Sequence, residues 1–142
     1  MKATYTLIAV VPRGWVALST KHQCTDTSHS GTKQFSDQLS KYGIDEKEFT
    51  SHFYDEPVSC FEFGMSPKIS VYLFSIIAGP YVTHESDKPE VQNYKFPLKL
   101  YSRKSVAKYV AAAKEDYFNV TKSGIDFYEK LFSTPYPFDK LD

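Results

Sequence analysis

The hydrophobic and polar positions divide the chain into strand-like blocks followed by a long helical segment. Residues 3–11 are rich in β-branched and aromatic side chains and end at Pro12 and Gly14, and residues 15–19 repeat this character. Because turn-forming residues separate two apolar runs, the pattern predicts a hairpin over residues 3–19. Further strands are predicted at residues 59–63, 69–78 and 94–101.

Two of these later strands carry a more specific expectation. Residues 69–78 contain almost no charge, so we expect a strand that is buried on both faces. In residues 94–101, Phe96, Leu98 and Leu100 alternate with other side chains. Pro97 lacks a backbone donor, which favours an edge position for this strand.

The segment between the two β blocks is polar and predicts different structure. Residues 20–34 are dominated by Thr, Ser, His, Gln and Lys, which is typical of a solvated loop. Phe35, Leu39 and Tyr42 then recur at helical spacing before Gly43, which predicts a short helix with a glycine cap. Residues 45–51 are polar and predict another turn or a short helical piece.

The period changes after Ser102. Apolar or small residues now recur every three or four positions, at Val106, Val110, Ala113, Tyr117, Val120, Gly124, Phe127 and Leu131. This spacing places them on one face of a long helix, which Pro135 and Pro137 should end near Ser133. Strands followed by one helix, without βαβ alternation, predict a mainly β chain with a C-terminal helix, an α+β fold.

Composition narrows the class of protein. The 142 residues are 42% hydrophobic and 16% aromatic, which is sufficient for a folded core. Seventeen basic residues balance 17 acidic ones, so the chain lacks the positive field of a nucleic-acid binder. The longest apolar run, residues 71–79, is too short to cross a bilayer, so no membrane is expected. The first residues show no signal segment, and a cytoplasmic location is the expectation.

One short loop gathers side chains that can bind metal ions. His22, Cys24, Asp26 and His29 fall within eight residues, but a single cysteine in His-x-Cys spacing matches no strong zinc pattern. A solvated loop is the favoured interpretation. A metal-binding function remains an alternative, which a zinc titration with His22 and Cys24 replaced would test.

A second segment begins like the helical zinc motif H-E-x-x-H. That motif needs two histidines four residues apart on one helix face, with the glutamate as general base. Here His84 and Glu85 are followed at the fifth position by Lys88, and Pro89 comes next. The segment is therefore predicted to be a loop, and the sequence offers no catalytic, cofactor-binding or metal residue. Cys60 is interpreted as a small buried thiol.

Four stretches together resemble a known family. Residues 2–19 contain Lys-Ala-Thr-Tyr-Thr-Leu and Gly-Trp-Val-Ala-Leu-Ser, residues 61–81 contain Ser-Pro-Lys-Ile-Ser-Val-Tyr-Leu, and residues 96–103 form a further similar strand. The most specific match is Gly-Ile-Asp-Phe-Tyr-Glu-Lys-Leu-Phe-Ser-Thr-Pro-Tyr-Pro-Phe-Asp-Lys-Leu-Asp at residues 124–142. They resemble the gluzincin zinc aminopeptidases (alanyl/glutamyl aminopeptidase, leukotriene-A-hydrolase-like). Residues 21–58 depart from this pattern as a longer loop.

The resemblance implies an architecture and an activity. Residues 1–102 would be the later part of the family's N-terminal β-sandwich domain, and residues 103–142 the opening helix and turn of its catalytic domain. The fold would then be a partial antiparallel β-sandwich followed by one long helix. The family removes N-terminal amino acids from peptides with zinc, but its G-A-M-E-N and H-E-x-x-H motifs follow the region matched here. We therefore expect no zinc site and no hydrolysis by these residues alone.

An alternative function follows from the same resemblance. Half of a sandwich exposes sheet edges and apolar surface, and such surfaces tend to pair. The chain is then expected to act as a structural or interaction module, through self-association or a partner protein that covers the exposed edges. Neither interpretation involves nucleic acid or a membrane.

Overall fold

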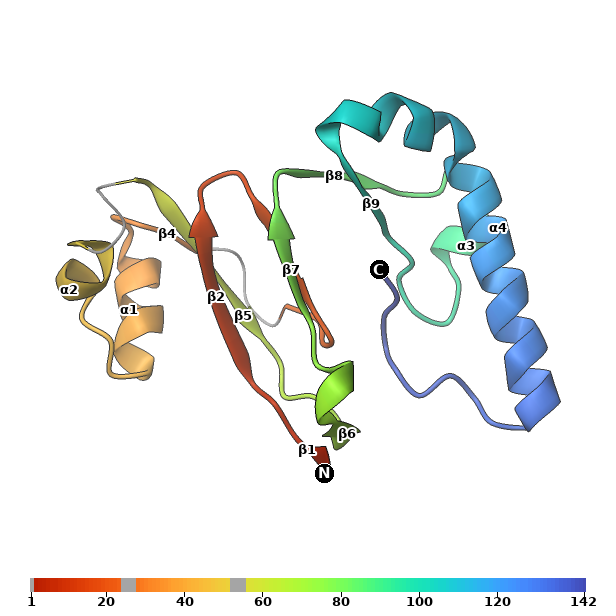
Figure 1. The fold of residues 1–142 in the computed structure, drawn as a ribbon, viewed down its shortest axis with the longest axis horizontal. Coiled ribbons are helices and arrows are strands. Elements are labelled where there is room, and N and C mark those ends of the chain that lie inside the picture. Colours follow the sequence, from red (N-terminus) through yellow and green to blue (C-terminus); the bar gives the residue numbers. More distant parts are fainter. Residues whose placement is uncertain (1, 24–27, 52–55) are drawn as a thin grey trace. The chain divides into compact units, whose positions relative to one another are not determined.

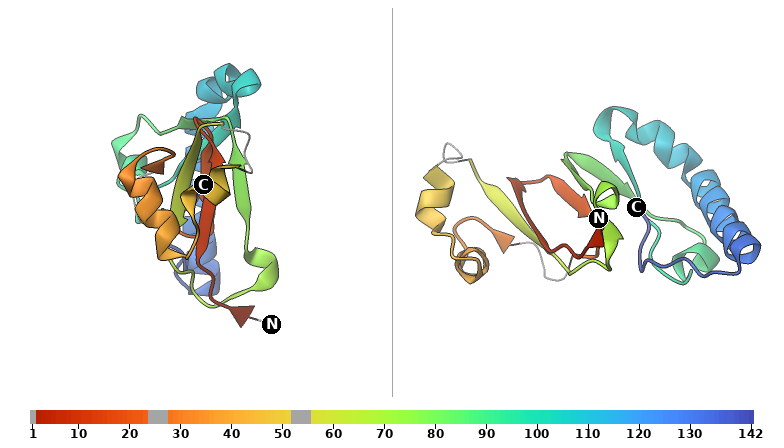
Figure 2. Two further views of the ribbon diagram at one scale, coloured as in Figure 1. Left: turned by 90° about the vertical axis from the view of Figure 1, so that its left-hand side faces the viewer. Right: turned by 60° about the horizontal axis from the view of Figure 1, so that its bottom comes forward.

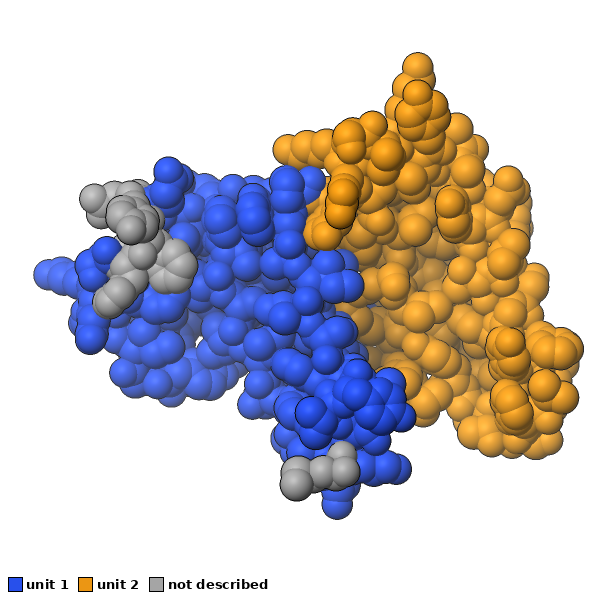
Figure 3. Space-filling view, in the orientation of Figure 1, with its two compact units in different colours: residues 1–80 blue, residues 81–142 orange. Residues whose placement is uncertain are grey.

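The computed structural model describes residues 2–23, 28–51 and 56–142. Backbone contacts divide the chain into two compact units, Met1–Pro80 and Tyr81–Asp142 (Figure 3). The elements of unit 1 are β1 (Lys2–Ala3), β2 (Leu7–Pro12), β3 (Val16–Ser19), β4 (Ser28–His29), α1 (Lys33–Lys41), α2 (Glu46–Ser51), β5 (Val58–Phe63), β6 (Ile69–Ser70), the 3-10 turn η1 (Val71–Leu73) and β7 (Ile76–Gly79). Those of unit 2 are β8 (Tyr81–His84), α3 (Pro89–Gln92), β9 (Leu100–Arg103), the 3-10 turn η2 (Lys104–Val106) and α4 (Ala107–Phe132).

These elements confirm the predicted fold class. The strands of the described ranges form small antiparallel sheets, in the orders β1-β6, β2-β5-β4, β3-β7 and β8-β9, and the long helix α4 follows them (Figure 1). The chain is therefore a mixed α+β fold that is mainly β before its C-terminal helix. Within the described ranges, none of the helices combines the length and apolarity needed to span a bilayer.

The central sheet of unit 1 has two apolar faces. β2 pairs antiparallel with β5 from Leu7 opposite Phe63 to Pro12 opposite Val58. Alternation along a strand sends successive side chains to opposite faces. One face contributes Ala9, Val11, Phe61 and Phe63 to a core that also contains Ala17 of β3, with Leu7 and Ala78 against it. This core joins the central sheet to the β3-β7 pair.

The opposite face of the same sheet is covered by α1. Phe35 and Leu39 of α1 are fully buried against Val58 and Cys60 of β5. Helix α1 confirms the predicted short helix, and α2 confirms the helical piece predicted at residues 45–51. Thr32 caps the N-terminus of α1 by accepting a hydrogen bond from the Phe35 amide (3.3 Å), and Gly43 follows the helix with φ +72°.

The predicted hairpin over residues 3–19 is wrong in its pairing. A tight turn does join β2 to β3, with the Trp15 amide donating to the Pro12 carbonyl (3.1 Å) and Gly14 at φ +85°. However, β2 pairs with β5, and β3 pairs with β7. The side chains of β2 and β3 instead meet across the core that contains Ala9 and Ala17. The turn thus carries the chain from one sheet to the next. The local sequence of such a turn is the same as that of a turn that joins two paired strands of one sheet.

The loop predicted over residues 20–34 is also partly wrong, because it includes a strand. Ser28 lies opposite Cys60 and His29 opposite Ser59, so β4 forms an edge of the central sheet. The Ser28 side chain is buried and its hydroxyl donates to Gln38 of α1. Pairing with β5 and a buried partner on α1 compensate for the low strand propensity of this polar stretch.

The continuous buried strand predicted over residues 69–78 is wrong as well. Turn η1 divides this segment into β6 and β7, which pair with β1 and β3 respectively. Tyr72 is 85% exposed, and Ile76 and Ile77 are about half exposed, at 50% and 48%. Low charge thus did not mean burial here, because a two-stranded pair with a single neighbouring layer leaves one face uncovered.

Unit 2 packs its own core against α4. Val91, Phe96, Leu98 and Phe118 are buried together, with Ile125 and other side chains around them. The strand predicted over residues 94–101 is confirmed only at its end, where β9 begins at Leu100. The preceding stretch is held by the C-terminal segment, since the Leu141 amide donates to the Pro97 carbonyl (3.2 Å) and the Lys99 amide donates to the Leu141 carbonyl (3.1 Å).

Helix α4 confirms the predicted long helix and its end. It closes at Phe132, followed by Ser133 in the left-handed conformation at φ +50°. In Figures 1 and 2, α4 is the long helix that runs from teal to blue, and its first turns lie at an angle to the longer remainder. The buried side chain of the helix is Phe118, which lies about 100° round the helix from the predicted apolar face at Tyr117.

Candidate functional site

The segment that begins like a zinc motif forms the end of a strand and a loop. His84 is the last residue of β8, and its Nε2 lies 2.8 Å from the Ser102 hydroxyl of β9, with both side chains buried. Glu85 is exposed and forms a 3.4 Å ion pair with Lys99. Lys88 precedes α3 as its N-cap residue. The segment is therefore not a mid-helix stretch, and His84 and Glu85 do not share a helix face.

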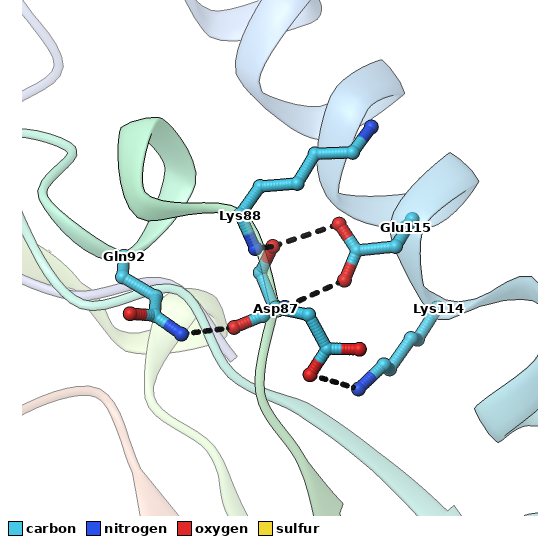
Figure 4. Close-up of polar contacts among 6 residues, drawn as sticks. Asp87, Lys88, Gln92, Lys114 and Glu115 are labelled. Carbon is cyan, nitrogen blue, oxygen red and sulfur yellow. Dashed lines mark hydrogen bonds and ion pairs between the residues drawn. The ribbon is translucent and has the colours of Figure 1, made fainter.

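The residues after His84 are instead fastened to α4 (Figure 4). The Glu115 carboxylate accepts hydrogen bonds from the Ser86 hydroxyl (2.8 Å) and from the Asp87 amide (2.7 Å). Lys114 on the same helix forms a 2.8 Å ion pair with the Asp87 carboxylate. The Gln92 side chain closes the loop by donating to the Ser86 carbonyl. We call Ser86, Asp87, Gln92, Lys114 and Glu115 the loop clamp.

The hydrogen bonds of the loop clamp change the pKa of Glu115. The hydrogen bond from the Asp87 amide, followed by that from the Ser86 hydroxyl, lowers the pKa of Glu115, and burial opposes this change. A carboxylate with two donors is an acceptor that holds a loop in place. Each of its two oxygens accepts a hydrogen bond from the loop, so Glu115 holds the loop against α4. Sequence reasoning missed the clamp because the contacts between the loop and α4 join residues 27 to 29 positions apart.

Replacing Glu115 by glutamine is expected to loosen this loop. The amide keeps one acceptor oxygen but loses the charge and the second acceptor, so the Asp87 and Ser86 donors cannot both be satisfied. We expect the unfolding temperature to fall by a few degrees and the amide of Asp87 to exchange faster with deuterium. The matched control is Asp116→Asn, one residue away on an exposed position, which should leave both quantities unchanged. Equal effects in the two variants would contradict the clamp.

A buried carboxylate lies in the central sheet of unit 1. Glu62 is only 7% exposed, in a strand whose other side chains are also buried. Its Oε1 accepts hydrogen bonds from Lys41 Nζ and from the Tyr42 hydroxyl (2.8 Å), both at the end of α1. The bond from Lys41 and then that from Tyr42 lower the pKa of Glu62. The sequence signal for this contact is the single carboxylate of Glu62 within an apolar strand, because a buried carboxylate needs a hydrogen-bonding partner.

Acid should release α1 from the sheet through Glu62. Because the folded-state pKa of Glu62 lies below the ordinary 4.5, its contribution to stability is present above pH 4.5 and is lost as the pH falls through the lower folded value. Deuterium exchange of α1 and β5 amides should therefore rise below about pH 4.5. In Glu62→Gln this pH dependence should disappear from those amides while unit 2 keeps its own. The same acid response in both proteins would contradict this assignment.

The metal-capable loop is only partly covered by the structure. Cys24 and Asp26 lie outside the described residues. His29 places its Nδ1 2.8 Å from the Ser59 hydroxyl, and the His22 carbonyl accepts a hydrogen bond from Gly64 (3.1 Å). The described ranges hold no group of three or more His, Cys, Asp and Glu side chains arranged to bind a metal ion. The metal alternative therefore stays a prediction.

Cys60 is a buried thiol, as interpreted from the sequence. Its side chain is fully buried in the core between α1 and the central sheet. Burial, and then the negative charge of Glu62, raise the pKa of the Cys60 thiol. Because the thiolate is the reactive form, a thiol with a raised pKa is a poor nucleophile at neutral pH. The role of Cys60 is therefore packing in the core.

Comparison with known proteins finds a similar sequence. The chain is similar over its whole length to part of an aminopeptidase. That protein is the aminopeptidase N of Streptomyces lividans, which is 28% identical over 142 residues, covering 100% of this chain and 13% of the relative. The chain thus spans about one eighth of that relative's length. No protein-family model matches the chain. The similarity supports an aminopeptidase-like segment.

Proposed function

We propose that these 142 residues are an aminopeptidase-like segment that does not hydrolyse peptides by itself. The observation that carries the proposal is the similarity to aminopeptidase N across all 142 residues of the chain. Residues 1–102 then correspond to the later part of an N-terminal β-sandwich domain, and residues 103–142 to the start of a catalytic domain. In this placement β8 and β9, which contact α4, would be the sandwich strands beside the opening helix.

The expected lack of catalysis follows from the residues around His84. A zinc aminopeptidase of the resembled family uses H-E-x-x-H, whose two histidines hold the metal and whose glutamate activates water. The one His-Glu pair in the sequence, His84 and Glu85, has lysine where the second histidine would stand. The Nε2 atom of His84 is also hydrogen-bonded to the Ser102 hydroxyl of the neighbouring strand. Residues 84–88 therefore do not fit the family's zinc motif, and no hydrolytic step is assigned to them.

An activity assay of the purified 142-residue chain tests the proposal. We expect no release of fluorophore from an alanyl-aminomethylcoumarin above background, with or without added zinc, and no stoichiometric zinc in equilibrium dialysis. His84→Ala is a matched variant that should behave identically. Zinc-dependent hydrolysis that chelation abolishes and that His84→Ala lacks would overturn the proposal. A cytoplasmic location is part of the same expectation, and fractionation of cells expressing the tagged chain would check it.

A second candidate function, a structural or interaction module, is favoured by the exposed segment at residues 71–77. Tyr72, Ile76 and Ile77 present large apolar side chains to solvent. Exposed contiguous apolar side chains of this kind mark protein interaction surfaces. In this function the half-sandwich binds a partner chain. Tyr72→Asp should leave the fold intact and abolish any association that this surface mediates. An association that is unaffected by Tyr72→Asp would contradict the role of this segment.

A further inference from the structure

The stretch that carries the most specific family resemblance, residues 124–142, has polar side chains that the proposed function does not use. It lies in unit 2, all of whose residues are described. Helix α4 ends within it at Phe132. We call the following residues, 133–142, the C-terminal strap. In Figure 1 this last, dark blue part of the chain runs from the end of α4 back to the stretch before β9.

The beginning of the C-terminal strap is held by one carboxylate of α4. Ser133 adopts the left-handed conformation at φ +50°, which turns the chain out of the helix. The Thr134 amide then donates to the Glu129 carbonyl (3.2 Å), and the Tyr136 amide donates to Oε1 of the Glu129 carboxylate (2.8 Å). The other carboxylate oxygen, Oε2, accepts from Lys95 Nζ in the stretch before β9. The Glu129 side chain therefore binds the strap and this stretch at the same time.

The middle of the C-terminal strap packs on the core of unit 2. The Tyr136 ring stacks on Phe96, with the ring centroids 4.8 Å apart and the planes at 29°. The Tyr136 hydroxyl donates to the Lys140 carbonyl (3.3 Å), which closes the turn between them. Tyr136 and Leu141 both pack against the cluster that contains Phe96 and Leu98. The strap thus covers part of this core.

The end of the C-terminal strap supplies a backbone partner. Leu141 forms a parallel bridge with Leu98, in which its amide donates to the Pro97 carbonyl (3.2 Å) and its carbonyl accepts from the Lys99 amide (3.1 Å). Buried backbone groups need such partners. The alternating stretch at residues 94–101 therefore pairs, at its centre, with the strap.

We propose that residues 124–142 form a latched strap, in which Glu129 is the latch. Glu129 is a positioning residue: it holds the C-terminal strap closed over the core and thereby places Leu141 beside Leu98. When the latch loses its charge, the strap opens and uncovers Phe96 and Leu98, while α4 and its core contact at Phe118 stay formed. This role requires neither zinc nor a partner protein, so it can fail independently of the proposed function.

The charges around Glu129 make the latch sensitive to acid. The hydrogen bond from Lys95, followed by that from the Tyr136 amide, lowers the pKa of Glu129, while partial burial and the charge of Asp126 oppose this change. Because the folded-state pKa lies below the ordinary 4.5, the latch is closed above pH 4.5 and opens as the pH falls through the lower folded value. The titratable and charged groups around it are Lys122 and Asp126 of α4, Tyr94 and Lys95 before β9, and Tyr136 of the strap.

Deuterium exchange of Glu129→Gln, detected by NMR in the 142-residue chain, tests the latch. Glutamine keeps the shape of the side chain and one acceptor oxygen but removes the charge. The protection factors of the Tyr136, Leu141 and Lys99 amides should fall by about tenfold at pH 7, as expected for loss of charge-assisted hydrogen bonds. The amide of Phe118 should keep its protection, because the helix and its core contact do not depend on the strap.

A pH profile and two further variants separate a latch from a general loss of stability. In the parent chain the strap amides should lose protection below about pH 4.5, and at a higher pH than the amides of α4. In Glu129→Gln they should start low and no longer respond to acid. Lys95→Met removes one of the two partners and should give a smaller loss at pH 7. Glu90→Gln, at an exposed position of α3, is the matched control and should change nothing.

Several outcomes would overturn the latch. Strap amides that are as well protected in Glu129→Gln as in the parent chain would show that stacking and the bridge at Leu141 hold the strap without it. An acid response that persists in Glu129→Gln would assign the titration to another group. An equal loss of protection along α4 and β8 would make Glu129 a general stabiliser. If Glu129→Gln does not fold, the parent profile decides, and simultaneous loss of strap and helix protection would reject the proposal.

Discussion

Replacing Phe118 by alanine is expected to destabilise unit 2 by about 3–5 kcal/mol, since it empties the centre of that unit's core. Phe118 is 3% exposed and packs with Val91, Phe96 and Leu98. Those three residues come from α3 and from the stretch before β9, so one side chain on α4 holds two other segments in place. A loss of this size is a large share of the 5–15 kcal/mol by which domains are typically stable.

Urea unfolding followed by deuterium exchange would measure this effect. Amides of α4 and β9 should lose protection in Phe118→Ala, while those of β2 and β5 should keep it because Phe118 belongs to the core of unit 2. Tyr109→Ala is the matched control on the same helix, where the side chain is 75% exposed. Its cost should stay within about 0.5 kcal/mol. A comparable loss in both variants would mean that Phe118 is not the centre of this core.

Replacing Phe35 by alanine should have a similar effect on unit 1, about 3–5 kcal/mol. Phe35 is fully buried between α1 and the central sheet, where it contacts a cluster containing Leu39, Val58 and Cys60. Because α1 also carries the Lys41 and Gln38 side chains that bond to the sheet and to β4, its release should expose these polar contacts as well. We expect a cavity too large for the sheet to close.

Exchange of the α1 and β4 amides, with the urea midpoint, would check this result. The control is Asp37→Ala, an exposed position two residues further along α1 that should change stability by less than about 0.5 kcal/mol. Retained protection of α1 in Phe35→Ala would show that the helix is held by its polar contacts rather than by the apolar core. The two alanine variants together also test whether the units unfold separately.

Local sequence predicted several elements because their signals lie close together in the chain. The helix before Gly43 combines apolar spacing with a left-handed glycine, and α4 combines seven regularly spaced residues with the prolines that follow it. Strand β5 is marked by a short apolar run. These are the cases in which propensity, period and stop signals agree.

The errors share a cause, which is that partners distant in sequence decide pairing and burial. The turn at Gly14 looks like a hairpin, but β2 finds β5 more than 45 residues later. The local sequence around Ser28 predicts a loop, but in the structure Ser28 pairs with β5 and its side chain bonds to Gln38. The candidate site changed for the same reason: residues 84–88 lack a second histidine in the sequence, and the structure adds that Glu115 holds them as a clamp.

The sequence by itself determined the fold class, the two main helices, the buried thiol at Cys60 and the incomplete motif at His84. Only the tertiary structure decided that several large apolar side chains of α4 and of residues 71–77 lie exposed. Hydrophobic period shows which residues share a face, because it follows from the geometry of a single element. It cannot show what covers that face, because burial depends on neighbours that come from elsewhere in the chain or from another molecule.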